Sequence, residues 1–343
     1  MSFWSSIFKL LVPIVIFLTI FPQKVFAHEN YVLTQQQINQ GMTDNNVHVL
    51  DVLNNPANVE IGLFVTAGIL ILIIIYFFFQ KSKPGVILDE SLKKLEPFGV
   101  FLLRIALGAS FLYSAFTNSY LGPEIPNSTL ILGNIIHYSL YILGVLLILG
   151  LFNNLTGFLS LIIIILATLT YKDYMMTYFN YFGEFIALML FGTRFIAIDQ
   201  FFPDLIGKIT AGIKKFEIPI IRITYGVSIL YPAISIKLLH PIIIIQIVNQ
   251  YHLNQIHWLF PQDPLFISLG TGLAQIAVGL FIIIGFETRM VSFITFLLYT
   301  MSILYFKEVV WPHYILLALA LYLVINNGGR YTIDNLFIKK WKK

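Results

Sequence analysis

The feature that most constrains the fold is a hydrophobic stretch that occurs twice. It covers residues 98–117, FGVFLLRIALGASFLYSAFT, and returns at 217–236 as EIPIIRITYGVSILYPAISI. Both copies set an arginine four residues before a glycine and a tyrosine five residues after it: Arg104, Gly108 and Tyr113 in the first copy, Arg222, Gly226 and Tyr231 in the second. An internal repeat of this length predicts a duplicated architecture.

The composition places both copies in a membrane. Hydrophobic residues make up 58% of the chain and charged residues 11%, whereas a soluble domain carries about 25% charge. Apolar runs of ~20 residues are long enough to cross a bilayer as helices. The net charge of +4 comes from basic residues between these runs, so it does not indicate nucleic acid. The absence of cysteine excludes disulfides, iron–sulfur clusters and thiolate metal sites in this chain.

The N-terminal part predicts export followed by one membrane helix. Residues 1–27 resemble a signal peptide, with an uncleaved anchor helix as the alternative. Residues 28–58 are polar and predict a short exported segment. Residues 59–80 then predict the first transmembrane helix of the mature chain, and residues 81–97 a basic linker.

Eight further spans predict an all-α, polytopic fold: two tandem parallel four-helix transmembrane bundles after the first helix. Their expected ranges are 98–117, 131–151, 155–171 and 183–198 in the first repeat, and 218–238, 265–285, 290–306 and 312–325 in the second. The repeats occupy 98–199 and 217–337, with a linker at 200–216 and a basic tail at 338–343. An even number of spans gives both repeats the same orientation.

The basic residues give the expected topology. They gather in residues 81–97, 200–216 and 338–343, and lysine and arginine are enriched in cytoplasmic loops. We therefore expect a multi-pass protein of the cell membrane, with the mature N-terminus outside and the C-terminus in the cytoplasm.

The repeats also match at their turns. Residues 149–152, LGLF, correspond to 284–287, IGFE, where the second helix of each repeat ends. Gly192 and Gly328 stop the last helix of each repeat. Asp199 and Asp334 follow, and we expect each to cap the short segment after it.

These features resemble the DoxX family of small four-helix membrane proteins. The resemblance rests on the Arg-x-x-x-Gly first helix, the glycine-ended second helix and the final GGRYTID at 328–334, and it covers about 98–337. Some members resemble subunits of quinone-linked sulfur oxidation or quinol oxidase assemblies. The resemblance therefore implies a redox subunit with quinone as its candidate ligand and no cofactor of its own.

The two repeated arginines are the first candidate ligand-binding residues. Arg104 and Arg222 lie about seven residues, or roughly 10 Å, into their helices. Burial there costs on the order of 2–3 kcal/mol each. Either they line a cavity and bind an anion or a quinone carbonyl, or they snorkel to the headgroups or pair with a neighbouring helix end.

Further candidates lie nearer the predicted outer surface. Glu184 begins the last helix of the first repeat, and His313 is its approximate counterpart. Either residue could handle protons beside Tyr113 or Tyr231 during quinol oxidation. The alternative is that they cap a helix or sit among headgroups.

The histidines gather on the predicted outer side. After cleavage His28 would carry a free amine and could bind copper, which makes it a weak metal candidate. No histidine pair has i, i+4 spacing, so scattered interfacial histidines are the alternative, and we expect no other metal site.

Two features of the second repeat point to a binding region. Pro232 interrupts the first helix beside Tyr231, which predicts a kink and a cavity. Residues 239–264 form an insertion with Trp258 near its end, predicted to lie in the interface as a lid, a docking surface or a passive insertion. Gly62, Gly68, Gly108, Gly226 and Gly279 are expected to be close-packing points between helices.

Three functions remain open. The first is a DoxX-like subunit of a respiratory or redox assembly that binds quinone or anchors an exported redox partner. The second is a transporter or a carrier of lipids or small molecules, and the third is a non-catalytic scaffold. The chain has no Walker loop, dinucleotide fingerprint, HExxH or nucleophile elbow, so the sequence does not specify a complete active site or decide whether the protein is an enzyme.

Overall fold

The computed structural model describes residues 32–44, 46–126, 133–192, 195–203, 205–253, 263–306 and 311–335. Several predictions lie outside these residues: the signal peptide at 1–27, His28, the part of the insertion that contains Trp258, and the basic tail.

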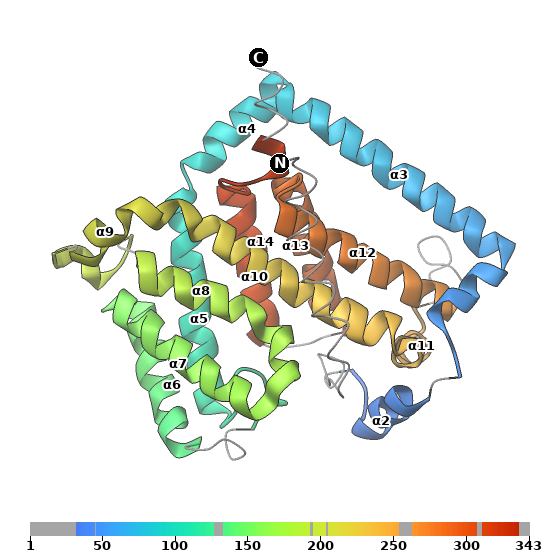
Figure 1. Ribbon diagram of the computed structural model, residues 1–343, viewed down its shortest axis with the longest axis horizontal. Helices are drawn as coiled ribbons and strands as arrows, with labels where there is room; N and C mark the ends of the chain where they lie inside the picture. Colours follow the sequence, from blue (N-terminus) through green and yellow to red (C-terminus); the bar gives the residue numbers. More distant parts are fainter. Residues whose placement is uncertain are drawn as a thin grey trace, which may run out of the picture. The chain divides into compact units, whose positions relative to one another are not determined.

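The described residues are helical throughout, which confirms the all-α class (Figure 1). An isolated bridge between Ser119 and Pro126 is the one β-type contact among them. The longer helices are α2 (Gln35–Thr43), α3 (Pro56–Lys81), α4 (Lys83–Lys93), α5 (Glu96–Phe116), α6 (Gly133–Leu149), α7 (Asn153–Tyr171), α8 (Phe179–Phe191), α10 (Glu217–Pro232), α11 (Pro241–Gln250), α12 (Pro264–Ile284), α13 (Thr288–Phe306) and α14 (Trp311–Asn326). The short α9 (Leu205–Thr210) precedes α10.

Six helical stretches in the described residues are long and apolar enough to cross a bilayer, so the chain is a multi-pass membrane protein. They are Pro56–Lys81, Glu96–Phe116, Asn153–Phe191, Ile206–Leu238, Pro264–Ile284 and Thr288–Phe306. The predicted break at Lys172 is a 3-10 helix, Lys172–Tyr178, that joins α7 to α8. The helices α6 and α14 are apolar but shorter, with 17 and 16 residues. The finer count of nine spans stays a prediction.

The last helix of the first repeat ends earlier than predicted. The sequence placed its end at residue 198, but α8 stops at Phe191 because Gly192 takes φ +58° and its N–H bonds to the carbonyl of Leu188. In the second repeat, Pro232 closes α10 and the chain continues as a π-helix, Ala233–Leu238. Proline has no N–H for the i−4 carbonyl, and in membrane helices a local π adjustment is one way to satisfy the backbone groups that this frees.

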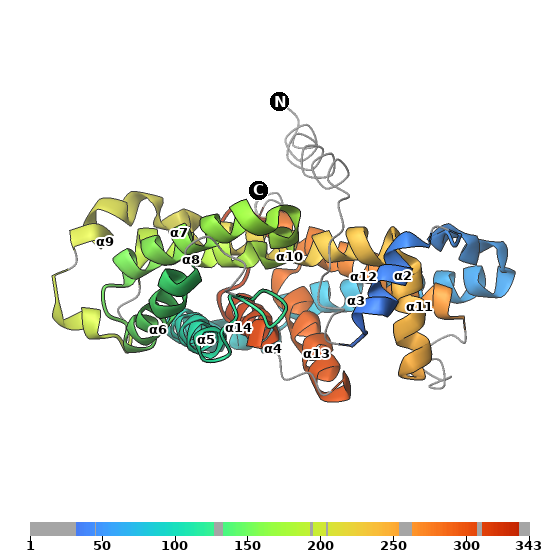
Figure 2. The ribbon, with the colours of Figure 1, turned by 90° about the horizontal axis from the view of Figure 1, so that it is seen from below.

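The chain divides into two compact units. The larger unit contains residues 63–170, 178–228 and 277–343, as far as they are described. In it α5 packs against both α6 and α14, and α14 packs against α13 as well (Figures 1 and 2). The helix α14 therefore forms the middle of this unit, and all but a few of its side chains are buried.

Paired glycines bring the first two helices of each repeat together. A Cβ on Gly108 of α5 would lie 2.9 Å from the carbonyl oxygen of Gly144 in α6. A Cβ on Gly226 of α10 would lie 2.7 Å from the carbonyl oxygen of Gly279 in α12. The close-packing prediction is confirmed for Gly108, Gly226 and Gly279. It is wrong for Gly68, which has no described atom within 4 Å of its Cβ position.

The smaller unit contains residues 32–62, 171–177 and 229–276, as far as they are described. Here α2 packs against α11, where Gly41 makes room for Ile243 (Figure 1). Gln37 Nε2 donates to Gln250 Oε1 at 3.0 Å, and Asn58 Nδ2 donates to Asp263 Oδ2 at 2.8 Å. The polar N-terminal segment and the insertion of the second repeat therefore fold against each other.

Candidate functional site

The guanidinium of Arg222 joins the first helix of the second repeat to the loop after its last helix. Nη1 donates to the carbonyl of Gly328 at 2.8 Å, and Nη2 donates to the carbonyl of Tyr331 at 3.0 Å. The residue is 2% exposed. These two carbonyls lie in the loop beyond the end of α14, so the arginine fixes that loop against the first helix of the repeat.

Arg104 occupies the same place in the first repeat. Its Nη2 donates to the carbonyl of Ile196 at 2.5 Å, in the segment that follows α8. Ile196 and Tyr331 both have positive φ, at +47° and +60°. Each arginine also presses against the glycine that ends the second helix, Gly150 or Gly285. The contacts place both arginines at a neighbouring helix end, which was one of the two alternatives from the sequence.

The aspartates after the last helices do cap a helix, although not the predicted one. Asp199 Oδ1 and Oδ2 accept from the backbone N–H groups of Phe152 and Asn153, each at 2.7 Å. Asp334 Oδ1 accepts from the backbone N–H of Glu287 at 3.1 Å. Each carboxylate therefore caps the third helix of its repeat, because the loop returns to the start of α7 or α13. The expectation that the aspartates cap the following segment is wrong.

The two repeats differ at the first turn of these third helices. Asn154 in α7 donates from Nδ2 to the carbonyl of Met189 at 2.9 Å. Arg289 holds the corresponding position in α13 and donates from Nε to the carbonyl of Val324 at 2.8 Å. Both side chains therefore contact a carbonyl near the end of the last helix of their repeat. Because arginine is longer and uses only Nε for this contact, its Nη nitrogens can bind a more distant group. Two positions earlier, Glu287 stands where the first repeat has Phe152.

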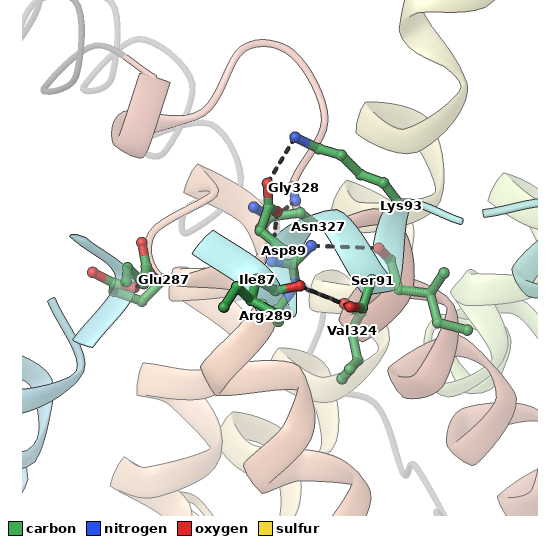
Figure 3. A network of polar contacts seen from close by, with 11 residues as sticks. Ile87, Asp89, Ser91, Lys93, Glu287, Arg289, Val324, Asn327 and Gly328 are labelled. Atoms are coloured by element: carbon green, nitrogen blue, oxygen red, sulfur yellow. Dashed lines mark hydrogen bonds and ion pairs between the residues drawn. The ribbon is translucent and has the colours of Figure 1, made fainter. Parts of the chain in front are cut away.

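Arg289 uses this reach to hold α4. Its Nη1 lies 2.8 Å from Asp89 Oδ1, and Asp89 Oδ2 lies 2.7 Å from Lys93 Nζ (Figure 3). Partial burial raises the pKa of Asp89, but the hydrogen bonds from Lys93 and Arg289 outweigh it and the pKa is lower than the ordinary value. Asp89 is therefore ionised at neutral pH and fixes α4 against the ends of α13 and α14.

A polar cavity of about 420 Å³ lies where these elements meet. It is lined by the end of α3, by α4, by the first turn of α13 and by the loop after α14. Its charged lining residues are Asp89, Lys93, Glu96 and Arg289, its amides are Gln80, Asn326, Asn327 and Asn335, and its aromatic rings are Tyr76 and Phe79. We call it the α3–α4 cavity. Most of the rest of α3 is apolar, and no residue of its membrane-crossing window is buried.

Glu287 adds a titratable group beside this cavity. Gln80, which lines the cavity, donates from Nε2 to Glu287 Oε2. Burial raises the pKa of Glu287 to about 7, with a further contribution from Asp334 that outweighs the hydrogen bond from Gln80. A carboxyl with this pKa exchanges its proton close to neutral pH.

Replacing Glu287 with glutamine is expected to remove a pH dependence of stability. The folded protein holds this proton more tightly than the unfolded chain, because the pKa rises from 4.5 to about 7. The contribution is complete below pH 4.5 and is lost as the pH rises through 7, on the order of 2–3 kcal/mol. Thermal unfolding in detergent between pH 5 and pH 8 measures it. Equal pH profiles for the wild type and Glu287→Gln would contradict the assignment.

The other predicted site residues are distributed over the two units. In the larger unit Glu184 is 2% exposed, and its Oε1 accepts from Asn180 Nδ2 at 2.9 Å. Tyr113 is 46% exposed, with its ring 4.6 Å from that of Trp311. His313 is buried and its ring stacks on Tyr299. In the smaller unit Tyr231 is buried next to Pro232.

The structure also groups residues that were not predicted as a site: Gln80, Asp89, Glu287 and Arg289. A signal for two of them was present in the repeat, because Glu287 and Arg289 replace the uncharged Phe152 and Asn154 in otherwise matching turns. Gln80 and Asp89 had no such signal. Asp89 is 200 residues from Arg289 in the chain.

Comparison of the chain with protein-family models, with curated proteins and with solved structures finds no match in any of the three. The features of the structure that bear on function are therefore the two arginine contacts, the α3–α4 cavity and the buried carboxyls.

Proposed function

We propose that the chain is a DoxX-like membrane subunit of a redox assembly and that it binds a quinone head group in the α3–α4 cavity. The observation that carries the proposal is the cavity itself. It brings aromatic rings and amides together at the end of a helix whose apolar surface is largely exposed, and its lining residue Gln80 bonds to the proton-exchanging Glu287. A quinone needs both a polar cavity and an apolar surface next to it. The cavity binds the carbonyls of the ring, and the apolar surface accommodates the tail, which is soluble only in lipid.

The matching contacts of the two repeats support tandem DoxX-like bundles. Arg104 and Arg222 donate from the same nitrogen to equivalent loop carbonyls. The backbone N–H of Asp199 donates to the carbonyl of Gly150 at 3.0 Å, and that of Asp334 donates to the carbonyl of Gly285 at 3.4 Å. These contacts link three helices in each repeat. A coincidence of sequence would not reproduce them.

The lining residues fit a quinone head group in size and chemistry. A volume of about 420 Å³ lies within the usual range of small-molecule sites. Tyr76 and Phe79 offer rings for stacking, and the asparagine amides offer hydrogen bonds to ring carbonyls. Exposed apolar side chains of α3, such as Leu72 at 60%, leave a surface for a tail.

A bound quinone supplies two-electron, two-proton redox chemistry. The residues of this chain bind the ring, and Gln80 orients the carboxyl of Glu287 through its hydrogen bond. Glu287 holds a proton below about pH 7 and takes one up from its surroundings when ionised. Since the chain contains no cysteine, we propose that an exported partner carries the electron-transfer centre.

Replacing Tyr76 with leucine is expected to lower the amount of bound quinone. Loss of the ring removes stacking worth about 0.5–1.5 kcal/mol, which corresponds to roughly a two- to twelvefold weaker affinity. The measurement is quinone per protein after gentle detergent extraction, followed by titration with a short-chain ubiquinone or menaquinone analogue.

The matched control is Phe78→Leu on the same helix. Phe78 is 65% exposed and does not line the cavity, so its replacement should leave quinone binding unchanged. Two results would contradict the proposal. One is a wild-type protein that neither co-purifies with quinone nor binds the analogue. The other is the same affinity in Tyr76→Leu and Phe78→Leu.

A carrier of small polar molecules is the second candidate, and the charge pattern of the same cavity favours it. Two acidic residues, Asp89 and Glu96, and two basic residues, Lys93 and Arg289, line it together. Such a lining suits a zwitterion. Uptake of amino acids into liposomes by the isolated protein, with no quinone bound, would favour the carrier.

A further inference from the structure

The segment between the two repeats is helical and exposed. Its helix α9 (Leu205–Thr210) is followed directly by a 3-10 helix, Ala211–Phe216, and then by α10. We call residues 205–216 the linker helix. None of residues 206–216 is buried, and the first buried residue of this stretch is Pro219.

The large apolar side chains of the linker helix form a row along one face. They follow one another at intervals of three, four and three residues, which is the helical period. Their exposed fractions range from 38% to 82%: Ile206, Ile209, Ile213 and Phe216. The value of 82% belongs to Ile209 and is the highest for a large apolar side chain among the described residues. Apolar surface of this extent is unfavourable in water and indicates a binding surface.

The rest of the linker helix is basic. It contains three lysines, Lys208, Lys214 and Lys215, and no acidic residue, and all three lysines are exposed. Lys208 and Lys215 each stand two residues after an isoleucine of the apolar row, so they point away from that row. An apolar row on one side and lysines on the other are typical of a helix that lies in the interface of a membrane.

The length of the following span places the linker helix at the edge of the membrane. The continuous stretch Ile206–Leu238 has 33 residues, which corresponds to about 50 Å of helix. The hydrocarbon layer is only about 30 Å thick. Part of the stretch must therefore lie outside this layer, and the lysines and the lack of buried side chains identify the linker helix as that part.

Two contacts within the larger unit fix the linker helix. The ring of Phe216 stacks on that of Tyr331, with centroids 5.4 Å apart and planes 5° apart. The carbonyl of Tyr331 accepts from Arg222, so this contact is tied to the arginine of α10. At its other end, α9 packs against α8. The linker helix is therefore held in place while its apolar row stays exposed.

We propose that the linker helix is a binding site for anionic phospholipids. The apolar row lies among the upper acyl chains, and the three lysines bind the phosphates of the surrounding headgroups. A headgroup with a net negative charge is attracted more strongly than a zwitterionic one. The site is independent of quinone binding, because no residue of the linker helix lines the α3–α4 cavity.

Spin labels measure the depth of the apolar row. The chain has no cysteine, so Ile209→Cys introduces a single site for a nitroxide label in the full chain. In vesicles of phosphatidylglycerol and phosphatidylcholine, we expect this label about 5–10 Å below the phosphates, accessible to oxygen and protected from a water-soluble nickel chelate. Ala211→Cys is the matched control, because Ala211 is exposed and lies off the apolar row, so its label should contact the chelate. Equal access of the chelate to both labels would overturn the proposal and leave the row for a protein partner.

Charge variants test the preference for anionic lipid. The full chain in a neutral detergent is titrated with phosphatidylglycerol or phosphatidylcholine of the same acyl chains, and bound lipid is counted by native mass spectrometry. Lys208→Gln and Lys215→Gln should each weaken phosphatidylglycerol binding roughly fivefold and leave phosphatidylcholine binding unchanged. Lys94→Gln removes an exposed lysine outside the linker helix and should bind both lipids like the wild type. The proposal is wrong if the linker variants keep the wild-type affinity, or if Lys94→Gln loses as much as they do.

Discussion

Replacing Arg222 with leucine is expected to destabilise the protein more than any other single change considered for this chain. The carbonyls of Gly328 and Tyr331 lose their donors, and a buried polar group without a partner costs about 1–3 kcal/mol. The cost of bringing arginine into the membrane is common to the folded and unfolded chain, so its removal does not compensate. We expect a loss of about 2–5 kcal/mol in the free energy of unfolding, measured by thermal unfolding in detergent. The yield of folded protein should also be lower.

Two further variants test the reason for this effect. Arg222→Lys keeps the charge but lacks the planar guanidinium that reaches two carbonyls. Its free energy of unfolding should therefore lie between those of the wild type and Arg222→Leu. Arg330→Gln changes an exposed arginine in the same loop and should have the stability of the wild type. If Arg222→Leu were as stable as Arg330→Gln, the arginine would not be holding the helix end, and its role would be in ligand binding.

Replacing Gly285 with alanine is the second change with a large expected effect. Gly285 has φ +69°, where a side chain costs roughly 1–2 kcal/mol. The added Cβ would also lie 2.3 Å from Arg222 Nη1 and 2.5 Å from Thr332 Cγ2. Both the backbone and the guanidinium would have to move. We expect a total loss of about 2–4 kcal/mol in the free energy of unfolding.

The first repeat offers an independent copy of this experiment. Gly150 has φ +65°, and its Cβ would lie 2.2 Å from Arg104 Nη1, so Gly150→Ala should have a similar effect. Gly270 in α12 is the control, because its Cβ position has no described atom within 4 Å. Alanine there should be neutral or stabilising, by up to about 1 kcal/mol of helix propensity. Equal losses at Gly270 and Gly285 would rule out the specific contact.

The helices could be predicted from the sequence because hydrophobic run length alone locates them. Each span predicted between residues 59 and 325 contains a helix in the described part of the chain. The end of α8 was misplaced because Gly192 overrides the apolar residues after it. Run length alone does not distinguish a helix that crosses the bilayer from a shorter apolar helix. The helices α6 and α14 were predicted as spans, and in the structure they are apolar helices shorter than the six candidate spans.

Of the residues that the structure brings together, only those marked by the internal repeat were predicted as candidates from the sequence. The repeated pattern drew attention to Arg104 and Arg222, but a pattern cannot say whether a buried arginine meets a ligand or a helix end. Asp334 was expected to act locally, yet it caps a helix that begins 46 residues earlier, at Thr288. The contact between Arg289 and Asp89 depends on how α4 folds back, which no local signal in the chain encodes.

The short helix in the middle of the larger unit has a consequence for the surrounding lipid. With 16 residues α14 is about 24 Å long, whereas the hydrocarbon layer of a typical bilayer is about 30 Å thick. Tilting cannot make up the difference, because a tilted helix spans a shorter distance across the bilayer. If α14 crosses the bilayer, as the sequence predicts, the hydrophobic mismatch is expected to thin the bilayer locally around this unit, and the protein should then be more stable in lipids with shorter acyl chains.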